Sequence, residues 1–355
     1  MPITVLIVDD SSFMRRMIAK IVDADPNLKV VGTAADGMEA IRQIKALRPQ
    51  VVTLDVEMPV LGGLDALKEI MRDCPVPVVM LSSLTESGAM ETIKALQYGA
   101  VDFIHKPSGA LSIDLIKIQQ EIQDTIKAAS KVDVGRLRSA LLRQPGQLSK
   151  EQQHSMKPQP TRAGVSQIVA IGASTGGPQA LTKILSELGG AFRHPVVIAQ
   201  HMPPSFTASL AARLNLLSPL HVSEAVHDEW LENGRVYIAP GDYHLNVVPV
   251  QGGYKIRLHQ RENGSRHRPS VDELFSSVAA LHSLKRHFVL LTGMGRDGAA
   301  AMGEAKASGA AATTIAEAKD TCVVYGMPRA AIEAGDVDKI VPLPAIAGAI
   351  MRACQ

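Results

Sequence analysis

The sequence is poor in several residue types, and each shortage excludes a class of protein. Aromatic residues make up only 3% of the 355 residues, so the cores must be aliphatic. The three cysteines, Cys74, Cys322 and Cys354, show no C-x-x-C spacing, which argues against a zinc site and a disulfide framework. No segment reaches the ~18 consecutive apolar residues of a membrane helix. The N-terminal stretch lacks basic residues and ends in Asp9-Asp10, which indicates a buried strand rather than a signal peptide.

Charge of one sign is also lacking. The formal net charge is +2 at pH 7, too close to neutral to suggest a nucleic-acid-binding or membrane-surface protein. With 46% hydrophobic residues the chain can form substantial cores, and its length favours two domains. We therefore expect a soluble, cytoplasmic protein that binds no nucleic acid and does not insert into a membrane.

Two regions alternate short apolar runs with amphipathic helices, a pattern typical of parallel sheets built from β-α-β units. In the first region, Phe13, Met17, Ile18 and Ile21 recur at helical spacing. The runs that predict strands are Thr4–Val8, Val30–Thr33, Val51–Leu54, Val78–Leu81 and Phe103–Ile104. Five strands alternating with five helices predict a flavodoxin-like α/β domain with a five-stranded parallel sheet over residues 1–126.

Residues 127–165 interrupt this alternation. They contain two acidic residues and eight basic ones, namely Lys127, Lys131, Arg136, Arg138, Arg143, Lys150, Lys157 and Arg162. The part from Gln144 to Gly164 is rich in Gln, Pro, Ser and Gly, which is typical of an interdomain linker. A charged run of this kind is usually a solvated tether, and the alternative is a docking strip for an acidic partner or domain face.

From residue 166 the alternation resumes and predicts a second α/β domain over residues 166–355. Its apolar runs are Ile168–Ile171, Val196–Ala199, Val236–Ala239, Phe288–Thr292, Ala310–Ile315 and Ile340–Val341. Tyr243–Val250 and Gly253–Gln260 alternate around a Gln-Gly pair, which predicts a β-hairpin. We expect a doubly wound, mostly parallel sheet with this hairpin added to it.

Acidic residues follow two of the strands predicted in the first region. Asp9 and Asp10 come directly after the first strand, and Asp55 directly after the third. Because the carboxyl ends of parallel strands share one edge of the sheet, these carboxylates should lie together, where their repulsion would favour Mg²⁺. Lys106 follows the fifth strand, and Ser82 lies at the end of the fourth, at the same edge. This set predicts a phosphoryl-acceptor site with Asp55 as the nucleophile, although a single strand-end Asp is usually only a solvated cap.

The first region resembles the receiver domain of response regulators. The stretches that carry the resemblance are Val8-Asp9-Asp10-Ser11, Leu54-Asp55-Val56-Glu57-Met58-Pro59, Gly62-Gly63-Leu64 and His105-Lys106-Pro107. The resemblance implies phosphorylation of Asp55 by a histidine kinase and a cis peptide between Lys106 and Pro107. It also implies that Phe103 occupies the place of an aromatic switch residue. Because Phe103 lacks a hydroxyl group, any switching would depend on its packing alone.

In the second region, Gly172-Ala173-Ser174-Thr175-Gly176 forms a G-x-S-x-G pattern between an apolar run and a helix. That context suits a nucleophilic serine on a sharp turn near free backbone N–H groups. The simpler interpretation is a glycine-rich turn whose serine caps the helix. A third is a phosphate-binding loop of a nucleotide-binding module, but the stretch has neither G-x-G-x-x-G nor a G-K-[ST] lysine.

Two further residues could complete a catalytic set with Ser174. His201 and Asp297 also follow predicted strands, so all three could meet at one sheet edge. A histidine can take the proton of the serine, and an aspartate can orient and stabilise the imidazolium. The order Ser, His, Asp differs from the Ser, Asp, His order of α/β-hydrolases. Spacing alone does not exclude His244 as a rival base.

Together these stretches resemble the catalytic domain of the chemotaxis protein-glutamate methylesterase family, CheB. The resemblance rests on Ile171-Gly172-Ala173-Ser174-Thr175-Gly176-Gly177, Gln200-His201-Met202-Pro203, Arg268-Pro269-Ser270-Val271-Asp272 and Thr292-Gly293-Met294-Gly295-Arg296-Asp297-Gly298. It implies that Ser174 is the nucleophile, His201 the general base and Asp297 its orienting partner. It further implies that the backbone N–H of Met294 is an oxyanion donor and that Thr175 adjoins the nucleophile.

What the resemblance implies for function is a phosphorylation-activated enzyme of chemotactic adaptation. The enzyme would demethylate γ-methyl glutamate and deamidate glutamine on chemoreceptors, without a cofactor for the hydrolytic step. Its phosphodonor would be the chemotaxis histidine kinase, and it would act as a monomer. The alternatives are a receiver joined to a nucleotide-binding module, and a non-catalytic adaptor that docks through the basic linker.

Overall fold

The computed structural model divides the chain into two compact units, Met1–Gly146 and Gln147–Gln355, and each is described by itself. It describes residues 1–82, 86–106, 112–132, 134–135, 157, 159–162, 164–261, 267–307, 309 and 312–355. Most of the linker expected at 127–165 lies outside these ranges. So does Pro107, and with it the expected cis peptide after Lys106. At the start of that linker, helix α5 continues to Ala129.

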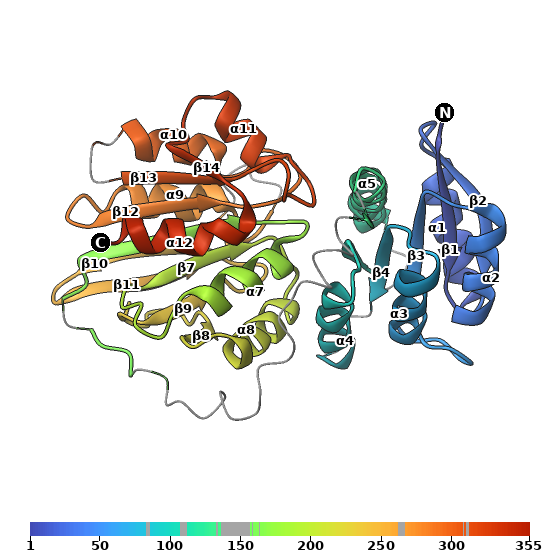
Figure 1. The fold of residues 1–355 in the computed structure, drawn as a ribbon, viewed down its shortest axis with the longest axis horizontal. Helices are drawn as coiled ribbons and strands as arrows, with labels where there is room; N and C mark the ends of the chain where they lie inside the picture. Colours follow the sequence, from blue (N-terminus) through green and yellow to red (C-terminus); the bar gives the residue numbers. More distant parts are fainter. Residues whose placement is uncertain are drawn as a thin grey trace. The chain divides into compact units, whose positions relative to one another are not determined.

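The first unit is built around a parallel five-stranded sheet in the order β2-β1-β3-β4-β5. Along the chain, its elements are β1 (Ile3–Val8), α1 (Ser12–Asp23), β2 (Leu28–Ala34), α2 (Gly37–Leu47), β3 (Val51–Asp55), α3 (Gly63–Asp73), β4 (Val78–Ser82), α4 (Glu86–Gln97), β5 (Asp102–His105) and α5 (Ser112–Ala129). Helices α1 and α5 pack together, and α2, α3 and α4 form a second group (Figure 1). Strands β3 and β4 are buried throughout, as their apolar runs predict.

The second unit contains a parallel seven-stranded sheet in the order β14-β13-β12-β6-β7-β9-β8. Its strands and helices are β6 (Gln167–Ala173), α7 (Gly177–Glu187), β7 (Val196–Gln200), α8 (Phe206–Leu217), β8 (His221–Glu224), β9 (Arg235–Ile238), β10 (His244–Val250), β11 (Gly253–His259), α9 (Val271–Ala279), β12 (Lys285–Leu290), α10 (Ala299–Ala307), β13 (Ala312–Glu317), α11 (Met327–Glu333), β14 (Lys339–Val341) and α12 (Leu343–Ala353). Helices α7, α8 and α12 form one packed group, and α9, α10 and α11 form the other (Figure 1).

The expected hairpin is present as a separate antiparallel pair, β10 and β11, rather than as part of the main sheet. Helix α9 packs against it, and the apolar side chains of Leu245, Val247 and Ile256 join the domain core. Strand β8 was not predicted. Within the part of the chain that the structure describes, no helix is both long enough and apolar enough to cross a bilayer.

Each sheet reverses its strand order near the middle, and the ends of the flanking strands form a crevice at such a point. In the first sheet β2 and β3 lie on opposite sides of β1. In the second, β7 and β12 lie on opposite sides of β6. The strand ends at these two places carry the acidic residues and the serine that the sequence singles out.

Candidate active site and phosphorylation site

The first crevice collects three carboxylates. Asp9 and Asp10 follow β1, and Asp55 ends β3, so that ligand oxygens from all three residues lie within 4.8 Å of one another. Asp9 and Asp55 are buried, whereas Asp10 is exposed. Mg²⁺ prefers hard oxygen ligands and usually keeps several waters when it is bound by carboxylates. The three carboxylates provide such oxygens, and the exposure of Asp10 leaves the site open to water. The donor set therefore fits the metal expected from the sequence.

Lys106 provides the positive charge at this edge. Its Nζ lies 2.6 Å from Oδ2 of Asp55 and 2.9 Å from Oδ2 of Asp9. Burial raises the pKa of Asp55 to about 6, an effect opposed by the Lys106 ammonium and reinforced by the charge of Asp9. The same two carboxylates outweigh burial and raise the pKa of Lys106. The lysine thus remains a cation beside the proposed phosphoryl acceptor.

The two other expected switch residues lie on the neighbouring strands β4 and β5. Ser82 is buried, and its hydroxyl accepts a hydrogen bond from Thr92 Oγ1 at 2.7 Å and donates to the Gly88 carbonyl at 3.3 Å. The backbone N–H of Lys106 donates to the Ser82 carbonyl, which places the two residues side by side. Phe103 is only 9% exposed. These contacts link the strand ends near Asp55 to helix α4.

In the second crevice, Ser174 occupies the turn between β6 and α7. The backbone N–H of Ser174 donates to the Thr292 carbonyl at 3.0 Å, and its carbonyl accepts from Gly177 N at 2.7 Å. The turn takes its positive φ, +81°, at Gly176, where a Cβ would lie 2.6 Å from Val323. Ser174 itself has no positive φ. The serine is half-buried, on a turn whose shape the glycine supplies.

His201 and Asp297 form a close pair at the same edge. His201 Nε2 lies 2.7 Å from Asp297 Oδ2, and the two side chains are 6% and 13% exposed. The backbone N–H of His201 donates to the carbonyl of Ala173, the residue before Ser174. Among the described residues, the other ring nitrogen, Nδ1, is buried without a hydrogen-bond partner. Nδ1 is therefore the histidine atom available to a neighbouring hydroxyl group.

The N-terminus of helix α9 holds the Asp297 carboxylate. Oδ1 accepts from Ser270 Oγ at 3.1 Å and Asp272 N at 3.0 Å, and Oδ2 also accepts from Val271 N at 2.7 Å. Burial would raise the pKa of Asp297, but the partner His201 and these N–H groups together hold it well below its usual range. The carboxylate is thus charged, fixed and directed at the imidazole.

Comparisons with known proteins agree with this geometry. A model of the CheB methylesterase family matches residues 169–350, and a response regulator receiver domain model matches residues 5–116. The chain belongs to the CheB methylesterase family. A protein of Geobacillus kaustophilus named protein-glutamate methylesterase/protein-glutamine glutaminase is 50% identical, covering 99% of this chain and 98% of the relative. One of the same name from Pyrococcus abyssi is 45% identical, covering 99% and 94%.

A solved structure extends the match to three dimensions. The CheB methylesterase catalytic domain of Thermotoga maritima is 42% identical, with a TM-score of 0.51, and covers 53% of this chain and 98% of that one. The resemblance inferred from the motifs is confirmed, as are the fold class and the enzyme class of methylesterase. The roles of individual residues stay predictions.

In this CheB family member the loop after β12 lies directly against the serine. At Gly293 a Cβ would come within 2.8 Å of the Ser174 Cβ and 2.3 Å of Met327 Sδ, so only glycine allows this approach. Met294 follows it and is half-buried. Its backbone N–H donates to no protein group in the ranges that the structure describes. Thr175, next to the serine, is buried, and its carbonyl accepts from Thr292 Oγ1 at 2.9 Å.

Several residues of the site escaped sequence reasoning. Gln200 Nε2 donates to the carbonyls of Ser174 and His201 and so joins the ends of β6 and β7. The ring of His267 stacks on that of His201, with centroids 4.1 Å apart. Of these residues, only Ser270 could have been predicted from the sequence, because Ser270 and Glu273 have the S-x-x-E spacing of a capping box. In the structure, Glu273 N donates to Ser270 Oγ.

The rival base His244 has another role. It is 2% exposed at the start of β10, and its Nδ1 accepts from the backbone N–H of Ser270 at 3.2 Å. Burial, the largest effect, lowers the pKa of His244. A neutral His244 thus supports the loop that holds Asp297, and His201 remains the predicted general base.

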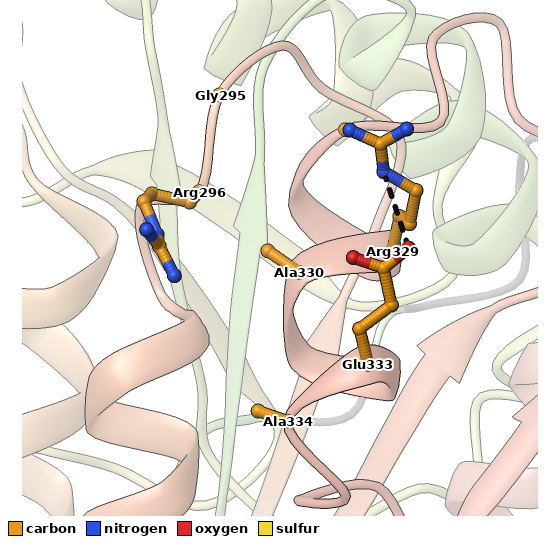
Figure 2. Close-up of a pocket in the computed structure, with 7 residues that line it drawn as sticks. Gly295, Arg296, Arg329, Ala330, Glu333 and Ala334 are labelled. Atoms are coloured by element: carbon orange, nitrogen blue, oxygen red, sulfur yellow. Dashed lines mark ion pairs between the residues drawn. The ribbon is translucent and has the colours of Figure 1, made fainter.

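A basic pocket of about 510 Å³ adjoins the loop after β12. It is lined by Gly295, Arg296, Gly326, Arg329, Ala330, Glu333 and Ala334. Figure 2 shows Arg296 on one wall, with Arg329 and Glu333 of α11 on the other. Arg329 Nε lies 3.8 Å from Glu333 Oε1, and both side chains are exposed. A pair this open and distant leaves the guanidinium available to a ligand.

Proposed function

We propose that this CheB family member hydrolyses γ-glutamyl methyl esters, and the amides of specific glutamines, on the cytoplasmic part of chemoreceptors. The observation that carries the proposal is the His201–Asp297 pair beside Ser174 at one sheet edge. The relatives that match over nearly the whole chain are named protein-glutamate methylesterase/protein-glutamine glutaminase. Ester and amide are neutral acyl groups of similar shape, so one site serves both.

Acyl transfer begins with attack of the Ser174 oxygen on the γ-carbonyl carbon. His201 takes the serine proton at Nδ1, because Nε2 faces Asp297. The fixed negative charge of Asp297 stabilises the imidazolium that forms. Imidazolium then donates the proton to the leaving oxygen or nitrogen, which departs as methanol or ammonia. Water, deprotonated by His201, cleaves the acyl-enzyme to release glutamate and restore the serine.

The carbonyl oxygen gains negative charge during each attack. The backbone N–H of Met294 is the donor that we assign to it, because Met294 follows Gly293, which lies against Ser174, and its N–H has no acceptor within the described ranges. A donor placed for the oxyanion lowers the barrier by about 3 kcal/mol in comparable enzymes.

The pocket beside the loop supplies a recognition element. Arg296 and Arg329 line this pocket together with Gly295, the residue after the proposed oxyanion donor. Their chemistry suits a receptor segment that carries carboxylates near the modified residue, since Arg pairs well with carboxylates. Each product glutamate adds negative charge to the receptor, which is how hydrolysis would alter signalling.

Regulation is assigned to the receiver unit. Asp55 would accept a phosphoryl group from a histidine kinase, and we assign Lys106 and Ser82, on the neighbouring strand ends, to contact phosphoryl oxygens. Asp9, Asp10 and Asp55 would hold Mg²⁺, which when bound neutralises charge between carboxylates and phosphate. Phosphorylation of Asp55 would relieve inhibition of the methylesterase unit by the receiver.

The decisive experiment measures methanol released from methylated chemoreceptor membranes, with and without a small phosphodonor and Mg²⁺. Ser174→Ala should abolish release under both conditions. Ser186→Ala is the matched control, because Ser186 is exposed on α7 and bonds only within its own helix. Methanol release by Ser174→Ala at the wild-type rate would refute the assignment of the nucleophile.

A further inference from the structure

Glu317, the last residue of β13, is a buried carboxyl group close to the active-site loop. It is fully buried and, within the described residues, forms no ion pair. Burial, the largest effect, raises its pKa to about 7, despite the lowering effects of the Thr292 N–H and of hydrogen bonds with the Thr321 and Cys322 side chains. A buried carboxyl without a cation is costly. Such a group needs an explanation, and one of its hydrogen bonds supplies it.

That contact is with the backbone of Thr292. Glu317 Oε2 accepts a hydrogen bond from Thr292 N at 2.9 Å. The pairing of β12 with β13 ends at Leu290 and Ala316, so Thr292 lies beyond the sheet ladder. The glutamate side chain therefore provides the acceptor that the sheet no longer offers. Without it, a buried backbone N–H would lack a partner, at a cost of about 1–3 kcal/mol.

Thr292 is bonded to the nucleophile segment on its other sides. Its carbonyl accepts the backbone N–H of Ser174 at 3.0 Å. Its hydroxyl donates to the Thr175 carbonyl at 2.9 Å and accepts from Val324 N at 2.9 Å. Two residues later in the same loop stands Met294. One threonine thus connects the serine, its neighbour and the proposed oxyanion donor to Glu317.

We propose that Glu317 is a positioning residue, which fixes the Thr292 loop and through it the relative placement of Ser174 and the Met294 N–H. The inference rests on the function proposed above. Displacements below 1 Å at such a site reduce the catalytic rate by large factors. The hydrogen bond from Thr292 to Glu317 should therefore affect the chemical step. Only an acceptor oxygen is required of Glu317, and a neutral amide oxygen should serve equally well.

Three substitutions in the full-length protein test this assignment. Glu317→Gln keeps the size and the acceptor oxygen, Glu317→Met keeps the size alone, and Glu317→Asp draws the carboxyl back from Thr292. With methylated receptor as substrate, we expect the kcat of Glu317→Gln to stay within about threefold of the wild-type kcat. Met and Asp should lose at least tenfold in kcat with KM within twofold, because binding surfaces are untouched. Glu304→Met, an exposed glutamate of α10, is the control.

The fold of each variant is checked by fluorescence of Trp230, the only tryptophan, which belongs to the methylesterase unit. A folded Met or Asp variant with wild-type kcat overturns the inference, as does a folded Gln variant below one-tenth of it. Failure of the inference is distinguishable from failure of the proposed function, because the latter would appear as no methanol release by the wild type, or as full activity in Ser174→Ala. If only Glu317→Gln keeps the wild-type kcat, a general loss of packing is excluded, because Glu317→Met keeps the size of the side chain as well.

Discussion

At the scale of single residues, the charge on Asp297 is the feature that we expect to control the chemistry most directly. Asp297→Asn keeps an acceptor for the N–H groups of α9 but removes the charge facing His201. We expect kcat on methylated receptor to fall by a factor on the order of 10³, with little change in KM. Asp228→Asn is the matched control, since Asp228 is exposed and its φ of +67° suits asparagine. A kcat loss below tenfold in Asp297→Asn would contradict the assigned role.

The raised pKa of Glu317 predicts that the stability of the protein depends on pH. Its pKa rises from the usual 4.5 to about 7 on folding, so the folded state binds the proton more tightly. The resulting stabilisation is complete below pH 4.5 and is lost as the pH rises through 7, by up to about 3 kcal/mol. Because Glu317→Gln cannot titrate, its stability relative to wild type should increase between pH 4.5 and 8. Urea unfolding followed by Trp230 fluorescence measures this, and a pH-independent difference would contradict it.

At the scale of elements, helix α11 presents Arg329 to the pocket beside the catalytic loop. Arg329→Glu should raise KM for methylated receptor about fivefold at low salt, with kcat within twofold, because it reverses one exposed charge that we propose binds an acidic substrate. The effect should shrink at high salt. Arg193→Glu is the control, because Arg193 lies before β7 at the opposite edge of the sheet. Equal KM values for the two variants would exclude this pocket from receptor binding.

The elements also separate what the sequence could predict from what it could not. Central strands such as β3, β6 and β7 are buried on both faces, so they read as continuous apolar runs. Strand β8 lies at the sheet edge with Val222 as its only buried residue, and it leaves no such run. Ser174, His201 and Asp297 could be proposed because each follows a run. Gln200 and Glu317 also end strands, but their roles depend on contacts with other segments that no local pattern encodes.

At the scale of the whole molecule, the prediction concerns coupling between the receiver and the methylesterase unit. The full chain should release methanol at least fivefold faster with a phosphodonor and Mg²⁺ than without them, a change typical of linked sites. Asp55→Asn should remove this stimulation while keeping the basal rate. Asp65→Asn is the control, because Asp65 is exposed on α3 and, among the described residues, pairs only with Lys68.

The same coupling predicts how the methylesterase unit behaves when it is separated from the receiver. Its counterpart in Thermotoga maritima has been solved as an isolated catalytic domain, so residues 166–355 should fold alone. If the unphosphorylated receiver restrains Ser174, this fragment should match or exceed the phosphorylated full chain in kcat, and a phosphodonor should not change it. A fragment no more active than the unphosphorylated full chain would rule out inhibition by the receiver. In that case phosphorylation of Asp55 would have to activate the methylesterase unit directly, rather than relieve its inhibition by the receiver.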